Sequence, residues 1–71
     1  MKNLNIVPEL SLFIEEKVSI KIKNGISITG TLRGFDQFLN VVVERQIIEN
    51  NHLYNEIIII RGSMVILIRS L

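Results

Sequence analysis

An alternation of apolar and polar residues around an Asn-Gly dipeptide is the feature of this sequence that most restricts its fold. The alternation runs through residues 18–23 and resumes in residues 26–33, on either side of Asn24-Gly25. A period of two places every second side chain on the same face of a β-strand. Asn-Gly favours the positive φ angles of a two-residue hairpin turn. The segment therefore predicts an antiparallel β-hairpin with one inward apolar face, made of Val18, Ile20, Ile22, Ile26, Ile28 and Leu32.

Three further strands are predicted downstream, at residues 40–48, 53–60 and 64–69. Gly30 and Gly34 lie on the inward parity of the second strand of the hairpin. A missing side chain at such a position permits a sharp bend or the close approach of another strand. We therefore expect an all-β chain, in which five antiparallel strands within residues 18–69 form a small, strongly bent, partly open barrel.

A short helix is predicted over residues 8–16, before the first strand. Pro8 suits the first turn of a helix, and Leu10, Phe13 and Ile14 follow at helical spacing. A helix of this length does not persist alone in water. Its apolar side chains are therefore expected to cover one open end of the sheet.

The small size of the chain predicts that it needs partner subunits. Its 71 residues form one domain, residues 1–71, and contain no cysteine for a disulfide. The last two predicted strands are apolar on both faces, although one face of such a strand normally meets water. We therefore expect these strands to be edges that pair with neighbouring subunits. The candidate interface residues are Ile57, Ile58, Ile59, Ile60, Val65, Ile66, Leu67 and Ile68.

Composition argues against several classes of function. An enzyme, a metal site and a cofactor are not expected, because the chain has no cysteine, one histidine (His52) and one aspartate (Asp36). No apolar run approaches the ~20 residues of a membrane span, so no membrane association and an intracellular location are expected. The net charge of +1 is low for a nucleic-acid-binding protein. Any RNA site must therefore depend on local geometry, or on charge summed over several subunits.

Two sequence motifs narrow the prediction to one family. Residues 18–25, Gly30-Thr-Leu-Arg-Gly-Phe-Asp36 and Phe38-Leu-Asn40 resemble the first motif of the Sm and Sm-like family. Ile57-Ile-Ile-Ile-Arg-Gly62 resembles the second. With the preceding helix the resemblance covers nearly the whole chain. It implies the Sm fold, which is a strongly bent five-stranded antiparallel barrel of the SH3-like or OB-like kind.

The resemblance also implies a function. Sm proteins form heptameric rings in which the fourth strand of one subunit pairs with the fifth strand of its neighbour, and single-stranded RNA follows the inner rim. Carried over to this chain, Phe38 would stack on a base, Asn40 would bind the base edge and Arg61 would cover its other side. Gly62 would allow close backbone approach, and Asp36 would orient the pocket by accepting a hydrogen bond from Asn40 or from a loop N–H.

Each of these residues also has a purely structural interpretation: core packing for Phe38, a turn amide for Asn40 and a solvated charge for Arg61. We favour the RNA-binding interpretation because the three residues occur together. An asparagine amide also presents a donor beside an acceptor, which matches a uracil edge. Ser63 and Gln37 depart from the usual motif, where an asparagine or aspartate and a proline are more common. Neither change removes a base-contacting group.

The leading hypothesis is a non-catalytic subunit of the heptameric core of spliceosomal small nuclear ribonucleoproteins, which acts in pre-mRNA splicing. Its partners would be other Sm proteins, with E and D-type members as neighbours, and a uridine-rich small nuclear RNA. It would act in the nucleus after cytoplasmic assembly and would bind no small-molecule substrate. One alternative is an Sm-like ring that binds oligouridine in RNA processing or decay. Another is an SH3-like peptide-binding module, which the single tyrosine and absent tryptophan disfavour.

Overall fold

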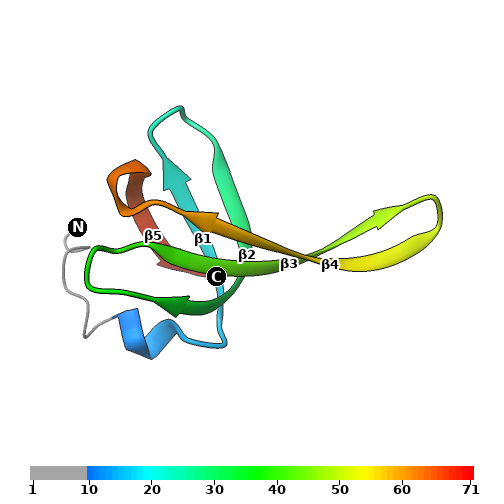
Figure 1. Cartoon of the computed structure of the whole chain (residues 1–71), viewed down its shortest axis with the longest axis horizontal. Helices are drawn as coiled ribbons and strands as arrows, with labels where there is room; N and C mark the ends of the chain where they lie inside the picture. Colours follow the sequence, from blue (N-terminus) through cyan, green and yellow to red (C-terminus); the bar gives the residue numbers. More distant parts are fainter. Residues whose placement is uncertain (1–9) are drawn as a thin grey trace.

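The computed structural model of the protein describes residues 10–71, which form one five-stranded antiparallel sheet (Figure 1). The strand order is β4-β3-β2-β1-β5. The elements are η1 (Ser11–Phe13), β1 (Lys17–Ile22), β2 (Ser27–Phe35), β3 (Val41–Glu49), β4 (His52–Ile60), η2 (Gly62–Met64) and β5 (Val65–Ser70). The predicted all-β fold is confirmed, with strand ends within a few residues of those expected from the sequence.

The two edges of the sheet are β4 and β5, as the two-sided apolar pattern of these strands predicted. Each is paired along one side only, β4 with β3 and β5 with β1. Its other side carries backbone N–H and C=O groups without a strand partner among residues 10–71. Such edges are available for pairing with another chain.

The core lies inside the bend of the sheet and contains only apolar side chains. Its buried members are Leu10, Val18, Ile20, Leu32, Val41, Val43, Ile60 and Ile68. Close contact between β2 and β3 explains one of the predicted glycines, because a Cβ atom on Gly30 would lie 2.5 Å from Val43 Cγ1 and 2.7 Å from the Glu44 carbonyl oxygen. The register of the two strands shifts between Leu32 and Gly34, which marks the predicted irregularity.

The N-terminal helix ends earlier than predicted. Within the described residues, helical conformation covers only Leu10 and the 3-10 turn Ser11–Phe13, whereas the expected start at Pro8 lies outside them. The chain leaves the helical conformation at Ile14 because the next residues pair with β2: Glu15 N donates to Leu32 O (2.8 Å). The expected anchoring is confirmed, since Leu10 is buried and Phe13 and Ile14 pack against the core.

The first hairpin turn also differs from expectation, whereas the turn between β3 and β4 lies where the predicted strand ends placed it. Asn24-Gly25 does not form a two-residue turn, because only Gly25 has a positive φ (+89°) and its N–H bonds to Ile22 O across a wider loop. The Asn24 side chain instead accepts a hydrogen bond from Ile26 N (3.1 Å). The two-residue turn occurs between β3 and β4, where Asn50 and Asn51 both have positive φ angles (54° and 64°). Asparagine is one of the few residues that adopts this conformation readily.

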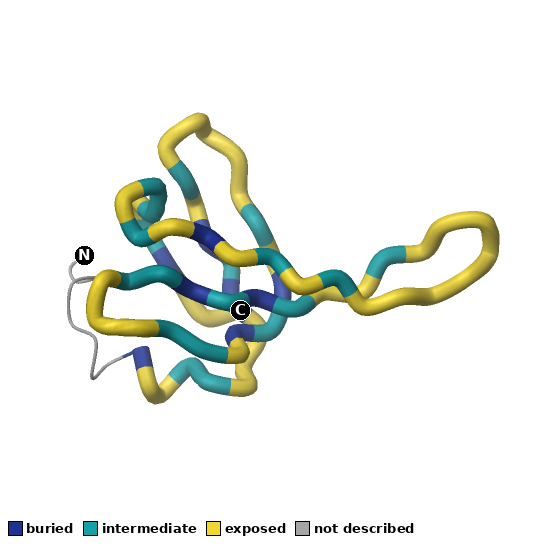
Figure 2. Tube along the Cα trace, in the orientation of Figure 1, coloured by how far each residue is buried: buried dark blue, intermediate teal, exposed yellow. Residues whose placement is uncertain are grey.

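The hairpin of β3 and β4 projects from the barrel as a long arm (Figures 1 and 2). Its tip is exposed, including the apolar pair Ile48 and Leu53. In the part of the chain that the structure describes, no helix is long and apolar enough to cross a membrane. The same residues contain no group of His, Cys, Asp and Glu side chains arranged to hold a metal ion.

Candidate nucleic-acid interface

Two loops that are distant in the sequence meet at one end of the barrel. The first, residues 36–40, joins β2 to β3, and the second follows β4 and contains Arg61 and Gly62. A Cβ atom on Gly62 would lie 1.8 Å from the carbonyl oxygen of Phe38. Only glycine permits this backbone approach. The sequence predicted that Gly62 makes room, but the group it admits is the first loop itself.

The Asp36 carboxylate organises the first loop. One oxygen, Oδ1, accepts hydrogen bonds from the backbone N–H groups of Phe38 (2.9 Å) and Asn40 (3.0 Å). The other, Oδ2, accepts one from Asn40 Nδ2 (2.9 Å). These contacts, led by the Asn40 side chain, hold the pKa of Asp36 below its usual value despite partial desolvation. Both kinds of hydrogen bond expected for Asp36 are therefore present.

Asn40 connects the two loops. While its Nδ2 donates to Asp36, its Oδ1 accepts a hydrogen bond from the backbone N–H of Gly62 (2.8 Å). A primary amide has two N–H donors and two acceptor lone pairs, so one of each remains for a ligand. From the sequence, a structural role in the turn and a base-binding role were alternative interpretations of the Asn40 amide. In the structure Asn40 uses one donor and one acceptor position to hold the loops together, and one of each remains available.

Phe38 and Arg61 present their side chains beside this network. Phe38 is 70% exposed, so the core-packing interpretation is wrong for this residue. It is held by a loop whose neighbour, Leu39, adopts a positive φ of 64°. Arg61 is also exposed, and its guanidinium forms no ion pair with residues 10–71. An exposed ring, a half-used amide and a free guanidinium together can stack on a base, bind its edge and reach a phosphate.

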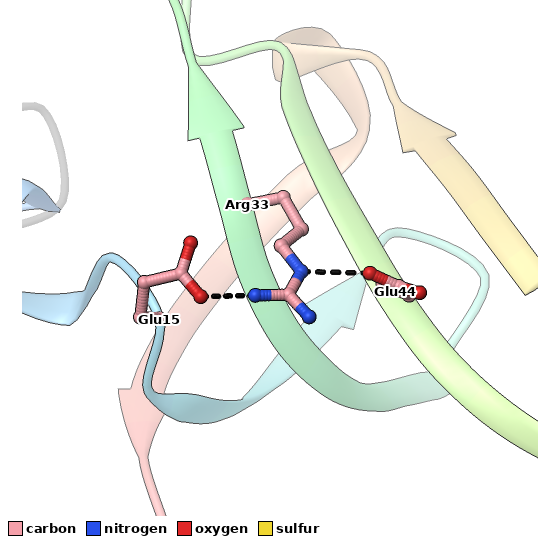
Figure 3. Close-up of polar contacts among 3 residues, drawn as sticks. All are labelled: Glu15, Arg33 and Glu44. Atoms are coloured by element: carbon pink, nitrogen blue, oxygen red, sulfur yellow. Dashed lines mark hydrogen bonds and ion pairs between the residues drawn. The ribbon is translucent and has the colours of Figure 1, made fainter. Parts of the chain in front are cut away.

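Sequence reasoning missed one cluster of charged side chains, centred on Arg33 (Figure 3). In the structure the Arg33 Nε donates to Glu44 Oε1 (2.7 Å) and its Nη1 pairs with Glu15. The hydrogen bond to Glu44, aided by both negative charges, raises the pKa of Arg33. The cluster ties the segment after η1 to β2 and β3. The pairing of β2 with β3 was the missing signal, because it brings Glu44 beside Arg33.

The eight predicted interface residues do not all face outward. Ile57, Ile59 and Ile66 are exposed at 57%, 71% and 45%. Ile60 and Ile68 belong instead to the core of the chain, because alternate residues of each strand point into the barrel. The half-buried members are Ile58, Val65 and Leu67. Of the eight predicted residues, the exposed ones on β4 and β5 are therefore the stronger candidates for contact with a neighbouring subunit.

Comparison with known proteins agrees with this architecture. The family model described as LSM domain matches residues 8–70. The chain is 36% identical over 66 residues to the probable small nuclear ribonucleoprotein G of Arabidopsis thaliana, covering 90% of this chain and 82% of that protein. It is 33% identical over 70 residues to small nuclear ribonucleoprotein G of Saccharomyces cerevisiae, covering 90% and 91%.

Solved structures give the same result. A heptameric archaeal Sm protein superposes with a TM-score of 0.73 at 29% identity, covering 90% of this chain and 97% of that chain. The P. aerophilum SmAP1 heptamer superposes with a TM-score of 0.76 at 26% identity, covering 99% and 97%. The resemblance expected from the two motifs is confirmed. The chain belongs to the LSM domain family, and its fold is the Sm fold.

Proposed function

We propose that this protein is a non-catalytic RNA-binding subunit of a heptameric ring, and that it holds one nucleotide of a uridine-rich single strand. The observation that carries the proposal is the Asp36–Asn40–Gly62 network. It fixes two loops in one arrangement, and leaves the ring of Phe38 and the guanidinium of Arg61 exposed beside it. Stacking on an aromatic ring accepts any base, so the preference for uridine is assigned to the free donor and acceptor of Asn40.

The proposed ring rests on the two edges of the sheet. Strands β4 and β5 each have a side without a strand partner among the described residues, and exposed isoleucines lie along both. Pairing β4 of one subunit with β5 of the next satisfies these backbone groups and covers the apolar side chains. The two solved relatives are heptamers. The neighbours would be other Sm proteins, with members of the E and D types beside this chain.

The proposed setting is the core of a small nuclear ribonucleoprotein that acts in pre-mRNA splicing, in the nucleus after cytoplasmic assembly. It is supported by similarity to small nuclear ribonucleoprotein G across most of the chain. A second candidate is an Sm-like ring that binds oligouridine in RNA processing. It is favoured by 29% identity over 59 residues to a probable U6 snRNA-associated Sm-like protein of Encephalitozoon cuniculi. The proteins and RNAs that copurify with the chain distinguish the two candidates. A spliceosomal subunit should copurify with other Sm proteins and small nuclear RNAs, whereas a subunit of an Sm-like ring should copurify with Sm-like proteins.

A binding experiment tests the RNA-binding proposal. Fluorescence anisotropy would compare the assembled protein on oligouridine, oligocytidine and oligoadenosine. Oligouridine should bind most tightly, and Phe38→Ala should weaken all three by the ~1 to 3 kcal/mol of a lost base stack. Leu12→Ala is the matched control, because Leu12 is 74% exposed but belongs to η1. Equal losses in the two variants, or no preference among the RNAs, would contradict the proposed pocket.

A further inference from the structure

The face of the sheet that points away from the core combines positive charge with hydroxyl groups. Alternate residues of β1 are buried, so the intervening residues lie on the outer face, together with their cross-strand partners on β2 and β5. We call this surface the outer face. It consists of Lys17, Ser19 and Lys21 on β1, Ser27, Thr29 and Thr31 on β2, and Leu67 and Arg69 on β5.

Charge is segregated between the two halves of the sheet. Strands β1, β2 and β5 contain no aspartate or glutamate, whereas β3 and β4 contain Glu44, Glu49 and Glu56. Arg33 and Arg45 are paired with two of these glutamates, so their charges are locally neutralised. The cations of the outer face are exposed and form no ion pair with any residue from 10 to 71. The outer face therefore carries three exposed cations and no acidic residue of its own, on a protein whose net charge is only +1.

A hollow of about 340 Å³ lies on this face between β2, β1 and β5. It is lined by Ser19, Lys21, Gly25, Ser27, Leu67 and Arg69. It thus has two cations, two hydroxyl groups and no acidic side chain. Ammonium, guanidinium and hydroxyl donors are the groups that bind phosphate oxygens in nucleic-acid complexes.

The outer face adjoins the candidate base pocket. The backbone N–H of Lys23, in the β1–β2 turn, donates to the carbonyl oxygen of Met64 in η2 (3.0 Å). The 3-10 turn η2 follows Arg61 directly. η2 and the β1–β2 turn therefore connect the loop of Arg61 to Lys21 and the hollow.

We propose that the outer face binds the phosphate backbone of RNA that flanks the nucleotide held by the two loops. The inference rests on the proposed RNA-binding function and adds a second, sequence-independent site to it. A hydroxyl lies between two cations on β1, with successive side chains of this face ~7 Å apart, and no base-stacking side chain accompanies them. Continuity with the pocket favours RNA over an acidic peptide as the occupant.

The experiment compares two uridine-rich RNAs on the assembled protein, one that only fills the pocket and one extended by flanking nucleotides. The test variant is Lys21→Gln/Arg69→Gln, which removes both cations of the hollow. A second variant, Lys17→Gln/Lys21→Gln, changes only β1, which is not an edge strand. The control is Asn50→Asp/Asn51→Asp at the tip of the β3–β4 hairpin, which changes the net charge equally. Aspartate tolerates the positive φ angles there.

The extended RNA should bind wild type more tightly than the short RNA, and this advantage should shrink in both test variants. Each lost phosphate contact makes the negative slope of log K against log [salt] shallower by about 0.7. Relative to binding at 1 M salt, this corresponds to roughly fivefold weaker binding at 0.1 M salt. The control should keep the wild-type slope, and the test variants should bind the short RNA normally.

Equal slopes in the control and test variants would overturn the proposal for the outer face while the pocket remained intact. If wild type binds an oligoglutamate peptide, and the test variants lose this binding but bind RNA as wild type does, the outer face is a site for an acidic protein. This result would also overturn the proposal. Failure of wild type to bind the short RNA would contradict the proposed function itself. These outcomes separate the two proposals.

Discussion

At the scale of single residues, Asn40 joins two loops and keeps hydrogen-bonding groups for the proposed recognition of a base. Its amide joins Asp36 to Gly62 and retains one donor and one acceptor. The network lies within the chain, so the candidate site is formed without a ligand. Pre-organisation of this kind reduces the entropic cost of binding.

Replacing Asn40 should therefore affect stability and specificity together. In Asn40→Ala the bond to the half-buried Gly62 N–H is lost, which should cost about 1 kcal/mol, or roughly 4 to 8 °C in melting temperature for a domain of this size. Discrimination for uridine at one position should fall more than overall affinity. Melting curves and anisotropy with mixed-base RNAs measure the two effects. A variant with wild-type stability and unchanged base preference would contradict the bridging role.

The Asp36 carboxylate predicts a pH dependence. Its pKa in the folded protein is lowered, mainly by the Asn40 amide, so its contribution to stability is complete above the unfolded pKa of about 4. That contribution is lost as pH falls through the lowered folded pKa. Wild type should therefore be more stable than Asp36→Asn at neutral pH, and the two should converge in strong acid. A stability difference that is the same at neutral and strongly acidic pH would contradict this assignment.

At the scale of elements, the contact between the two loops depends on Gly62. A Cβ atom there would overlap the Phe38 carbonyl, so Gly62→Ala should force the loops apart and cost about 1 to 3 kcal/mol. RNA affinity should fall with it. Gly34→Ala is a matched control, since a Cβ atom at Gly34 meets nothing within 4 Å. Chemical denaturation of both variants measures the difference, and similar values for the two would argue against close packing of the loops.

Strands β1 and β2 were predictable from the sequence because burial of one face imposes a period of two on them. The edges were predictable for a related reason, since β4 and β5 are apolar on both faces. The N-terminal turn was not predicted correctly, because pairing of residues 15 and 16 with Leu32 overrides local helical spacing. The width of the Asn24-Gly25 turn and the partners of Arg33 were also missed. Both depend on strand register, which the sequence does not state.

The residues of the candidate site were predicted through family motifs, and their geometry was only partly predictable. The spacing of four residues placed Asp36 close enough to accept a hydrogen bond from Asn40. It did not reveal that the Asn40 oxygen faces Gly62, because that contact joins positions 22 residues apart. Long-range contacts of this kind depend on the closure of the barrel.

At the scale of the whole molecule, the exposed edges predict assembly. Ile59→Lys should block it, because Ile59 is 71% exposed on edge strand β4 and a charge buried at a subunit seam is costly. Ile48→Lys is the control, because Ile48 is similarly exposed (76%) but lies near the tip of the β3–β4 hairpin. Native mass spectrometry, with purified partners where assembly requires them, should show rings for wild type and the control only. An intact ring that contains Ile59→Lys would contradict the edge assignment.

The central claim is that Phe38 and Arg61 hold one nucleotide of a uridine-rich strand in the assembled ring. Crosslinking tests it most directly: 4-thiouridine is placed at each position of the bound RNA in turn, and the crosslinked peptides are sequenced by mass spectrometry. We predict that one position crosslinks to the peptide that contains Phe38 or Arg61, and that Phe38→Ala weakens this crosslink selectively. If the ring binds RNA but no position crosslinks to either peptide, this chain is a structural spacer and the account of its pocket is wrong.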